Sequence, residues 1–387
     1  MLRLSQSPTD PAFVQNPYPF YDRARAQAEV FWWSDYDMVC AVSYDAVRAA
    51  LKDRRMGREA PPECAPPVPK GLEPFYAIEA HSMLELEPPR HTRLRGLVLR
   101  AFTSRRIAEL APEITALCHT LIDAFPAEPF DLLTHYAQPV PVRIIARLLG
   151  VPEDSSDNLL RWSNAMVAMY QASRTPQIEA AAVVACREFT AFLQDYIAEK
   201  RKAPRDDLIS TLIAAEEDGE KLTTDELITT CILLLNAGHE ATVHTLGNGV
   251  KTLLETGHRD FSDQGIEEIF RFDPPLHMFT RWVYEDVEIG GVALKRGDQI
   301  GCLLGAANRD QAAYGNPNTF DPTRPIKQNT SFGGGIHFCV GAPLARLEVK
   351  IALDVLFKRC PELKLAAPPA YADVFHFHGL QSLTVTR

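Results

Sequence analysis

Apolar residues along most of the chain recur every three or four positions, which is the spacing of amphipathic α-helices. Prolines interrupt this spacing over residues 110–201, so that stretch is predicted to form several helices rather than one. Further helices are predicted at residues 19–25, 44–51, 266–271 and 347–357. Strand-like patterns are confined to short stretches, at residues 31–42, 287–298 and 299–304. The pattern therefore predicts a mainly α-helical protein with small β-sheets, an α+β fold.

The longest uninterrupted helical pattern covers residues 223–254. Thr223 and Glu226 have the spacing of a capping box, and from Leu227 onward the pattern is apolar on nearly all sides, which indicates a buried helix. Gly238 and Glu240 lie in its middle, although a glycine and an acid inside a buried helix both cost stability. Two interpretations are open: close packing at Gly238 with a hydrogen-bonded Glu240, or a local opening of the helix with the acid in a proton relay.

Length and composition limit the class of protein. A chain of 387 residues with 46% hydrophobic residues can bury a large core, and no linker or repeat divides it, so we expect residues 1–387 to form a single domain. The net charge of −10 argues against nucleic acid as a partner. The first 21 residues show neither a signal-peptide core nor a membrane-spanning run. We therefore expect a cytoplasmic monomer that binds no membrane.

The eight cysteines are scattered without disulfide spacing, so reduced thiols are expected. One of them, Cys339, follows three consecutive glycines and precedes a helical pattern. A position at the positive end of a helix predicts a lowered thiol pKa and a thiolate that can bind a metal. Zinc is not expected at Cys339, since no second cysteine or histidine stands at chelating spacing, whereas an iron held by a porphyrin fits one thiolate. The alternative is a buried structural cysteine beside a glycine turn.

Residues 331–346 read Ser-Phe-Gly-Gly-Gly-Ile-His-Phe-Cys-Val-Gly-Ala-Pro-Leu-Ala-Arg. This stretch resembles the haem-binding signature of the haem-thiolate monooxygenases, the cytochrome P450 family, in its soluble bacterial form. The matching positions are Phe332, Gly333, Gly335, His337, Cys339, Gly341 and Ala345. The resemblance implies the cytochrome P450 fold, with a long central helix over haem b (iron protoporphyrin IX). It also implies Cys339 as the iron ligand and haem contacts from Phe332, Gly333, Gly341 and, on the central helix, Ala237.

His91 and Arg95 stand four residues apart, on one face of a predicted helix. This spacing suits paired carboxylates, but it is also common on a solvated basic face. The phrase at residues 87–95 resembles the second haem contact of the family, which implies that His91 and Arg95 bind the haem propionates. By the same resemblance, Arg281 matches a third propionate ligand and His337 a fourth.

Glu268 and Arg271 lie three residues apart on a predicted helix, where a surface ion pair would contribute little to stability. The phrase resembles the Glu-x-x-Arg motif of the family, and residues 320–324 resemble the motif that supplies a second arginine. The resemblance implies that Glu268, Arg271 and Arg324 form a buried structural group that braces the haem pocket.

The phrase Ala-Gly-His-Glu at residues 237–240 resembles the oxygen-binding motif of the central helix, which implies that Glu240, Ala241 and Thr242 form the oxygen and proton-relay region. In the family a threonine usually follows the acid, whereas this chain has Ala241 there and a threonine one place later. One residue turns the side chain by roughly 100°, so Thr242 need not reach the oxygen. Water or a substrate hydroxyl could deliver the proton instead, and poor coupling of reductant to product is expected.

The expected substrate is a small organic molecule of low polarity, because the candidate lining is mostly apolar. The resemblance places substrate contacts at Leu233, Ala237, Met278, Phe279 and Phe375, the last within a predicted strand turn at 374–377. The proline-rich loop at residues 61–74 overlies the active site in the family and is a candidate lid.

The expected reaction is insertion of one atom of O2, with electrons from a separate ferredoxin- or flavodoxin-type donor, since no flavin or NAD motif is present. Arginines that could dock such a donor occur at 93, 100, 105 and 106, although scattered solvated arginines are an equal alternative. Two other functions stay open: a peroxide-driven peroxygenase and a haem ligand sensor without turnover.

Overall fold

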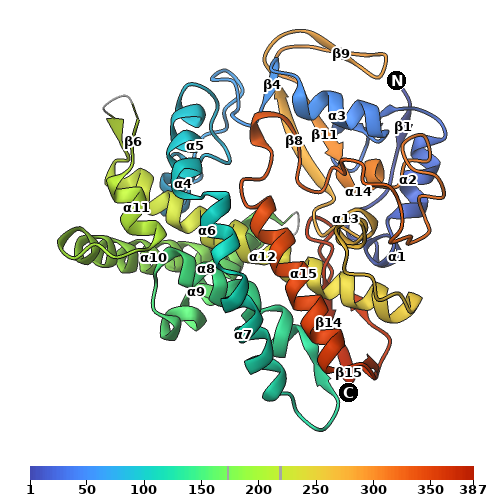
Figure 1. The fold of residues 1–387 in the computed structure, drawn as a ribbon. Coiled ribbons are helices and arrows are strands. Elements are labelled where there is room, and N and C mark those ends of the chain that lie inside the picture. The colour runs from blue at the N-terminus through green and yellow to red at the C-terminus, as the bar shows by residue number, and fades with distance from the viewer. Residues whose placement is uncertain (172–173, 218–219) are drawn as a thin grey trace.

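The computed structural model describes residues 1–171, 174–217 and 220–387. Most of this part of the chain is helical (Figure 1). The α-helices are α1 (Pro11–Gln15), α2 (Tyr18–Arg25), α3 (Tyr44–Lys52), α4 (Glu73–Glu79), α5 (Arg90–Ala101), α6 (Ser104–Glu109), α7 (Ala111–Asp123), α8 (Pro139–Leu149), α9 (Ser156–Val167), α10 (Pro176–Lys202), α11 (Leu208–Ala214), α12 (Thr224–Thr256), α13 (Asp263–Phe272), α14 (Leu304–Asn308) and α15 (Ala342–Arg359). A π-helical turn η1 (Leu133–Ala137) and short 3₁₀ turns η2 (Glu153–Ser155), η3 (Ala168–Tyr170) and η4 (Gly335–His337) complete the helices described.

The strands form one larger sheet and several small ones. The six-stranded sheet has the order β1-β2-β3-β11-β8-β4, in which β11 runs parallel to β3 and antiparallel to β8. Its strands are β1 (Arg3–Leu4), β2 (Val30–Trp33), β3 (Met38–Ala41), β4 (Met56–Gly57), β8 (Met278–Val283) and β11 (Gln299–Leu303). The small sheets pair β9 (Val287–Ile289) with β10 (Val292–Leu294), β13 (Ala370–Tyr371) with β14 (Leu380–Ser382), β6 (Glu216–Glu217) with β7 (Glu220–Lys221), and β12 (Lys364–Leu365) with β15 (Thr384–Thr386) and β5 (Phe130–Asp131).

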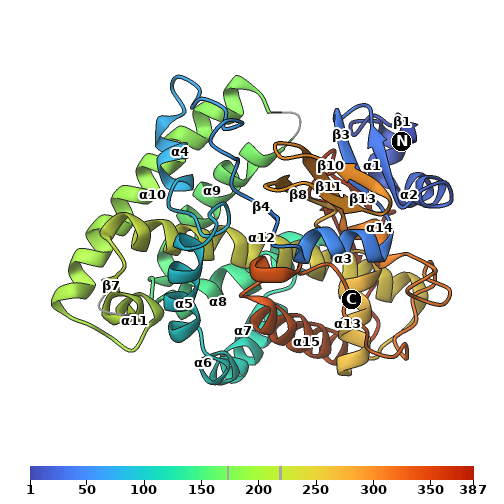
Figure 2. The same cartoon turned by 90° about the horizontal axis from the view of Figure 1, so that it is seen from above.

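The long buried helix predicted at residues 223–254 is α12. Its capping box is formed, because the Thr223 side chain accepts from the Glu226 N–H and the Glu226 side chain accepts from the Thr223 N–H. The helix ends at Gly257, whose φ of 76° suits a glycine. It crosses the interior of the molecule and packs against α8, α9, α10 and α15 (Figures 1 and 2). The prediction of a helix that organises the core is confirmed.

The shorter elements agree with the sequence pattern to within a few residues. The strand-like stretch at 31–42 forms β2 and β3, residues 287–298 hold the β9–β10 hairpin, and 374–377 lie in the connection between β13 and β14. The helix after the cysteine loop begins at Ala342, with Pro343 in its first turn as expected, and it continues through the predicted stretch 347–357. In the part of the chain described, no helix is long and apolar enough to cross a membrane.

Seen from above, the helical elements and the six-stranded sheet lie side by side (Figure 2). The helical part has its own large core, which includes the buried faces of α5, α8, α12 and α15. A second core lies between the sheet and α3. A third core is aromatic and joins Phe13, Phe20 and Trp33 near the N-terminus to Phe375 near the C-terminus. The last contact packs the rings of Phe13 and Phe375 with centroids 5.0 Å apart.

Candidate haem site

The loop that carries Cys339 is shaped by its glycines. Gly333 and Gly335 have φ angles of 70° and 68°, a region that side chains with a Cβ rarely adopt. A Cβ on Gly335 would lie 2.4 Å from the Leu51 carbonyl oxygen, so the loop presses against the end of α3. After η4 the chain reaches Cys339, whose N–H donates to the Phe332 carbonyl at 3.0 Å, and α15 begins three residues later. The sequence therefore fixes the cysteine at the N-terminal end of a helix.

The predicted lowering of the Cys339 pKa is wrong for the chain by itself. Although the Cys339 side chain is exposed, desolvation by the protein around it raises the pKa of the thiol. This effect outweighs the opposing effects of the Gly341 and Ala342 N–H groups and of the Arg95 and Arg346 guanidinium groups. Those N–H groups nonetheless point to the sulfur, as the helix end requires. The N–H and guanidinium groups around Cys339 would stabilise a thiolate, but without a ligand they are not sufficient to deprotonate the thiol. A bound metal ion converts such a thiol to a thiolate.

His91 and Arg95 lie on α5 and face the same loop. His91 is 2% exposed, and neither of its ring nitrogens has a hydrogen-bond partner among the described residues. Burial, with the nearby His337 and Arg95, lowers the pKa of His91 to about 4, so the ring is neutral at pH 7. Arg95 donates from Nη2 to the carbonyl of Phe338, the residue before Cys339, at 2.5 Å. Both side chains therefore lie at the cysteine loop and have N–H groups that could donate to a ligand.

Arg281 and His337 reach this region from β8 and η4. Arg281 is 2% exposed, burial lowers its pKa, and its hydrogen bond in the described structure goes from Nη1 to the Thr280 carbonyl at 2.8 Å. The His337 ring lies 4.4 Å from that of His91, and its Nε2 is 2.8 Å from Glu87 Oε1. Burial alone would raise the pKa of Glu87, but the bonds from His337 and from the Arg58 N–H outweigh it and lower that pKa.

We call His91, Arg95, Arg281 and His337 the donor group. Buried donors without acceptors are costly, and a buried guanidinium needs an anion. Within the described residues Glu87 serves His337, and no carboxylate of the chain is paired with the other three. A haem brings two propionates and an iron that accepts one thiolate. The donor group and Cys339 therefore fit a haem.

The central helix forms another wall, at residues 237–242. Ala237 is exposed and Gly238 is packed, since a Cβ on Gly238 would lie 3.2 Å from the Ile145 side chain on α8. The helix is continuous from Thr224 to Thr256, so the structure favours close packing at the glycine over a local opening. Thr242 is buried, and its hydroxyl donates to the Gly238 carbonyl at 3.4 Å, within its own helix. This contact agrees with the expectation that Thr242 does not replace the missing threonine.

Glu240 has two histidine neighbours on α12. Its Oε1 is 3.2 Å from Nε2 of His244, one turn later, and its Oε2 is 3.5 Å from Nε2 of His239. Burial would raise the pKa of Glu240, but the hydrogen bond and charge of His244 outweigh it and keep the pKa below its usual value. The acid is therefore ionised, and it lies against the imidazole rings of His244 and His239.

The five candidate substrate contacts fall into two sets. Ala237 is exposed, and Leu233 and Phe279 are half-buried, so all three keep side-chain surface that a ligand could contact. Met278 and Phe375 are only 3% and 4% exposed and pack in the aromatic core with Phe13 and Trp33. As described, these two side chains offer little surface to a substrate, so their role as substrate contacts stays a prediction.

Glu268, Arg271 and Arg324, here called the acid triad, are in contact. Arg271 binds Glu268 through two bonds of 2.7 Å, from Nε to Oε2 and from Nη2 to Oε1, while Arg324 Nε lies 3.3 Å from Oε2. The Glu268 and Arg271 side chains are each 2% exposed. Carbonyl groups at 308, 315, 316, 317 and 319 accept the remaining donors of the two arginines. The interpretation as a surface pair is therefore wrong.

The arginines proposed as a docking site lie on α5 and α6, and three of them have acid partners in the chain. Arg93 pairs with Glu226, Arg105 with Glu109 at 2.9 Å and Arg106 with Asp206 at 2.8 Å. Their charge is thus partly balanced, which favours the alternative of solvated arginines over a dedicated dock.

Sequence analysis missed two residues of the site. His244 stands four residues after Glu240, so the helical spacing was a usable signal for their contact. Glu87 opens the phrase that contains His91, but its partner His337 is 250 residues away, and no local pattern predicts that pair.

The chain resembles known proteins over most of its length. The family model for cytochrome P450 matches residues 29–256 and 252–365. The chain is 37% identical to the cytochrome P450 monooxygenase PikC of Streptomyces venezuelae, over 92% of this chain and 87% of that protein. It is 35% identical to the polyketide biosynthesis cytochrome P450 PksS of Bacillus subtilis, over 100% of this chain and 99% of that protein.

Solved structures show the same fold. P450BioI, crystallised with an acyl carrier protein that carries hexadec-9Z-enoic acid, superposes with a TM-score of 0.90 at 33% identity and covers 97% of this chain and 99% of its own. The family match, the relatives and this shared fold lead to one conclusion. The chain belongs to the cytochrome P450 family and is a haem-thiolate monooxygenase of the bacterial type.

Proposed function

We propose that residues 1–387 form one catalytic domain that binds haem b, with Cys339 as the iron ligand. The bound enzyme hydroxylates a small organic substrate of low polarity. The observation that carries this proposal is the donor group beside Cys339, in which His91 has two unpartnered ring nitrogens and Arg281 is buried without an anion. Two propionates would satisfy these donors. Phe332, Gly333, Gly341 and Ala237 would contact the haem faces and edges.

When bound, the haem supplies the activation of O2 that the side chains of a protein cannot perform. The chain's own residues have three tasks. The N–H groups of Gly341 and Ala342 stabilise negative charge on the Cys339 sulfur. Ala237 and Leu233 on α12, with Phe279 on β8, exclude water and position the substrate by apolar contact. The acid triad braces the segment that leads from α13 to the cysteine loop.

Proton delivery rests on Glu240 and not on Thr242. Glu240 is ionised and bound to His244, so it can accept a proton from the imidazole and release it to water in the interior. Ala241 has no hydroxyl to complete the route, so an ordered water or a hydroxyl group on the substrate takes that part. Poor coupling of reductant to product follows for substrates that lack such a hydroxyl.

Relatives support the substrate class. A vitamin D(3) 25-hydroxylase from Pseudonocardia autotrophica is 36% identical over 97% of this chain, and a mycinamicin IV hydroxylase/epoxidase from Micromonospora griseorubida is 36% identical over 84%. Both names denote hydroxylation of a small organic compound, and the second also denotes an epoxidase. Electrons for this chain would come from a separate ferredoxin- or flavodoxin-type protein in the cytoplasm.

The experiment that tests the ligand assignment compares the wild type with Cys339→Ser. The reduced carbonyl complex of the wild type is expected to show the Soret band typical of thiolate-bound haem, and the variant is expected to lose it completely. Cys360→Ser, at a buried cysteine on the C-terminal side of α15, is the matched control and should keep the band. The band in Cys339→Ser would contradict the assignment.

A second comparison separates turnover from the two other functions. Product that requires O2 and an electron donor supports the monooxygenase. Product with peroxide alone would show a peroxygenase, and ligand binding without product under both conditions would show a sensor.

A further inference from the structure

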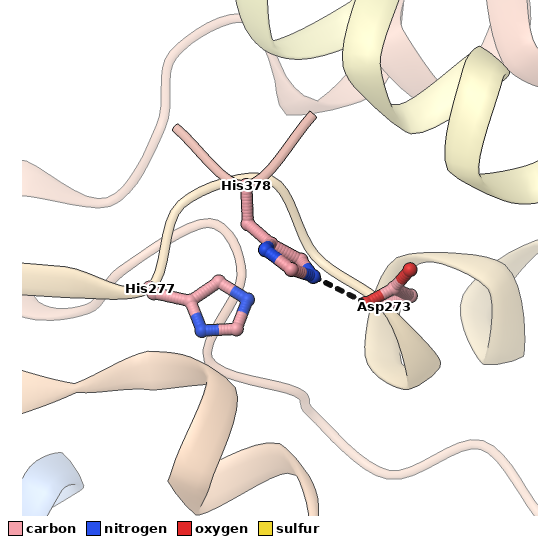
Figure 3. A group of neighbouring side chains, drawn as sticks. All are labelled: Asp273, His277 and His378. Atoms are coloured by element: carbon pink, nitrogen blue, oxygen red, sulfur yellow. Dashed lines mark ion pairs between the residues drawn. The ribbon is translucent and has the colours of Figure 1, made fainter. Parts of the chain in front are cut away.

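Three buried side chains with metal-binding atoms gather away from the haem site. Asp273 caps the end of α13, His277 lies just before β8, and His378 lies in the connection between β13 and β14. They are 6%, 0% and 1% exposed, and one candidate ligand atom from each lies within 4.8 Å of the other two. Figure 3 shows the three side chains directed toward a common point. The topology thus joins segments that are about 100 residues apart in the sequence.

Both histidines have unsatisfied nitrogens here. His277 Nδ1 is 2.8 Å from the Tyr21 hydroxyl, and its buried Nε2, on the side facing His378, has no partner within the described residues (Figure 3). Neither ring nitrogen of His378 has a hydrogen bond in that part of the chain, although Nε2 is 3.6 Å from Asp273 Oδ1. A buried polar group left without a partner is destabilising. Three such atoms at one place point to a bound species.

Asp273 is a buried carboxylate without a cationic partner. The Tyr18 hydroxyl donates to Oδ1 at 2.9 Å, and the Tyr371 hydroxyl donates to Oδ2. Arg309 lies nearby, but it donates to the Phe272 carbonyl at 2.8 Å and stacks over the Tyr18 ring. Across residues 1–171, 174–217 and 220–387, no lysine or arginine comes within ion-pair distance of Asp273. One negative charge and free imidazole nitrogens therefore face each other in a dry interior.

We propose that Asp273 Oδ1, His277 Nε2 and His378 Nε2 bind a divalent transition-metal ion, with zinc as the species that fits best. Zinc binds imidazole nitrogen and carboxylate oxygen at about 2.0–2.2 Å, and ligands on a tetrahedron of that size lie about 3.4 Å apart. The observed 3.6 Å between His378 Nε2 and Asp273 Oδ1 is close to this separation. Small side-chain rotations bring the third ligand in, and water or the Tyr18 oxygen takes the fourth position.

The surroundings of the proposed ligands are those of a metal site. A metal-bound histidine usually donates its other ring N–H to an oxygen, which fixes the ring, and the Tyr21 hydroxyl is placed to accept from His277 Nδ1. The His378 ring is stacked on Tyr371, with centroids 3.8 Å apart and planes at 13°. The ion shares no ligand with the haem, so its role is structural: it fastens the end of α13 to the C-terminal turn.

The test measures zinc in the purified haem-containing enzyme after growth in zinc-supplemented medium. Wild type is expected to hold about one zinc per chain in addition to haem iron, and His378→Phe, which keeps the stacking on Tyr371, is expected to hold less than about a tenth of that. His376→Phe removes a histidine from the same turn but not from the cluster, and it should keep the full zinc content. Asp273→Asn is a second variant with an expected loss like that of His378→Phe.

Absorption at the zinc K-edge, which haem iron does not disturb, gives the ligand set. Nitrogen and oxygen neighbours at about 2.0–2.1 Å, with two imidazole rings, support the site. Sulfur neighbours, zinc retained in His378→Phe, or wild type free of zinc after growth with added metal would each overturn it. Because the haem–carbonyl spectrum is recorded on the same samples, loss of zinc with an intact thiolate band separates this site from the proposed function.

Discussion

The acid triad and the donor group both contain buried basic side chains, yet they differ in what the N–H groups of those side chains bind. In the triad, two arginines share one carboxylate, and backbone carbonyls accept their other donors. In the donor group, Arg281 donates one hydrogen bond, to the Thr280 carbonyl, and the His91 ring has no hydrogen-bond partner among the described residues. The first set is complete within the chain. The second is complete only with a ligand that brings negative charge.

This difference teaches how to distinguish a structural cluster from a binding cluster when both consist of the same residue types. A chain that folds for its own stability satisfies its buried charges, since each unpaired one is strongly destabilising. Unsatisfied donors that the fold holds in place therefore indicate a ligand. The comparison predicts opposite responses to mutation in the two sets.

The largest effect is expected from Glu268→Gln. It leaves Arg271 and Arg324 without a countercharge, and removing one partner of a buried ion pair costs about 3–5 kcal/mol of unfolding free energy. Urea unfolding of the haem-containing enzyme measures the loss. The control is Glu255→Gln, which breaks the exposed pair with Lys251 and should cost less than about 1 kcal/mol. Equal losses in the two variants would erase the distinction.

A smaller and opposite effect is expected from Arg281→Met. Without haem the chain loses an unpaired buried cation, so its unfolding free energy should stay level or rise. Haem binding should weaken about 10–100-fold, the range seen when groups that support a metal site are removed. The rate of haem transfer to an excess of an acceptor apoprotein measures this.

Arg55→Met, at an exposed arginine paired with Asp53, is the matched control and should transfer haem at the wild-type rate. If the Arg281→Met apoprotein is less stable than wild type and the variant keeps its haem, Arg281 stabilises the fold and does not bind the haem.

Glu79 is intermediate between the two sets, because its buried carboxyl group is only partly paired. Its substitution should have the smallest effect on stability. Glu79 accepts from the Tyr170 hydroxyl at 3.0 Å and competes with Glu85 for Arg58. Burial, and then the charge of Glu85, raise the pKa of Glu79 to about 7. A raised carboxyl pKa means that the folded chain binds the proton more tightly than the unfolded chain does. Stability is therefore lost as the pH rises from the unfolded pKa, near 4.5, to about 7.

Glu79→Gln removes this cost. The variant should be more stable than wild type by about 1–2 kcal/mol at pH 8, since the side chain keeps some contact with solvent, and the gain should shrink toward pH 5. Glu63→Gln, at an exposed acid whose pKa Arg296 lowers, should show no gain at pH 8. Denaturant unfolding at the two pH values checks both variants, and a gain that does not depend on pH would contradict the titration of Glu79.

Local sequence predicted much of this molecule because the signals themselves are local. The capping box of α12, the glycines before Cys339 and the Glu268–Arg271 spacing each lie within a few residues. Long-range contacts carried no such signal. Desolvation by the surrounding protein set the direction of the Cys339 pKa, and the N-terminal ring of Phe13 packs against Phe375. Neither outcome can be obtained from a pattern, since both depend on which distant segment covers the side chain.

The aromatic core that joins Phe13 and Trp33 to Phe375 has a consequence for biosynthesis. The ribosome makes roughly 340 residues between these partners, which takes roughly 20–70 s at about 5–20 residues per second. During that interval the N-terminal rings lack their last partner and stay partly exposed, a state that chaperones bind. This corner of the protein is therefore completed only once Phe375 has emerged from the exit tunnel, whereas the helices around α8 and α12 can assemble earlier.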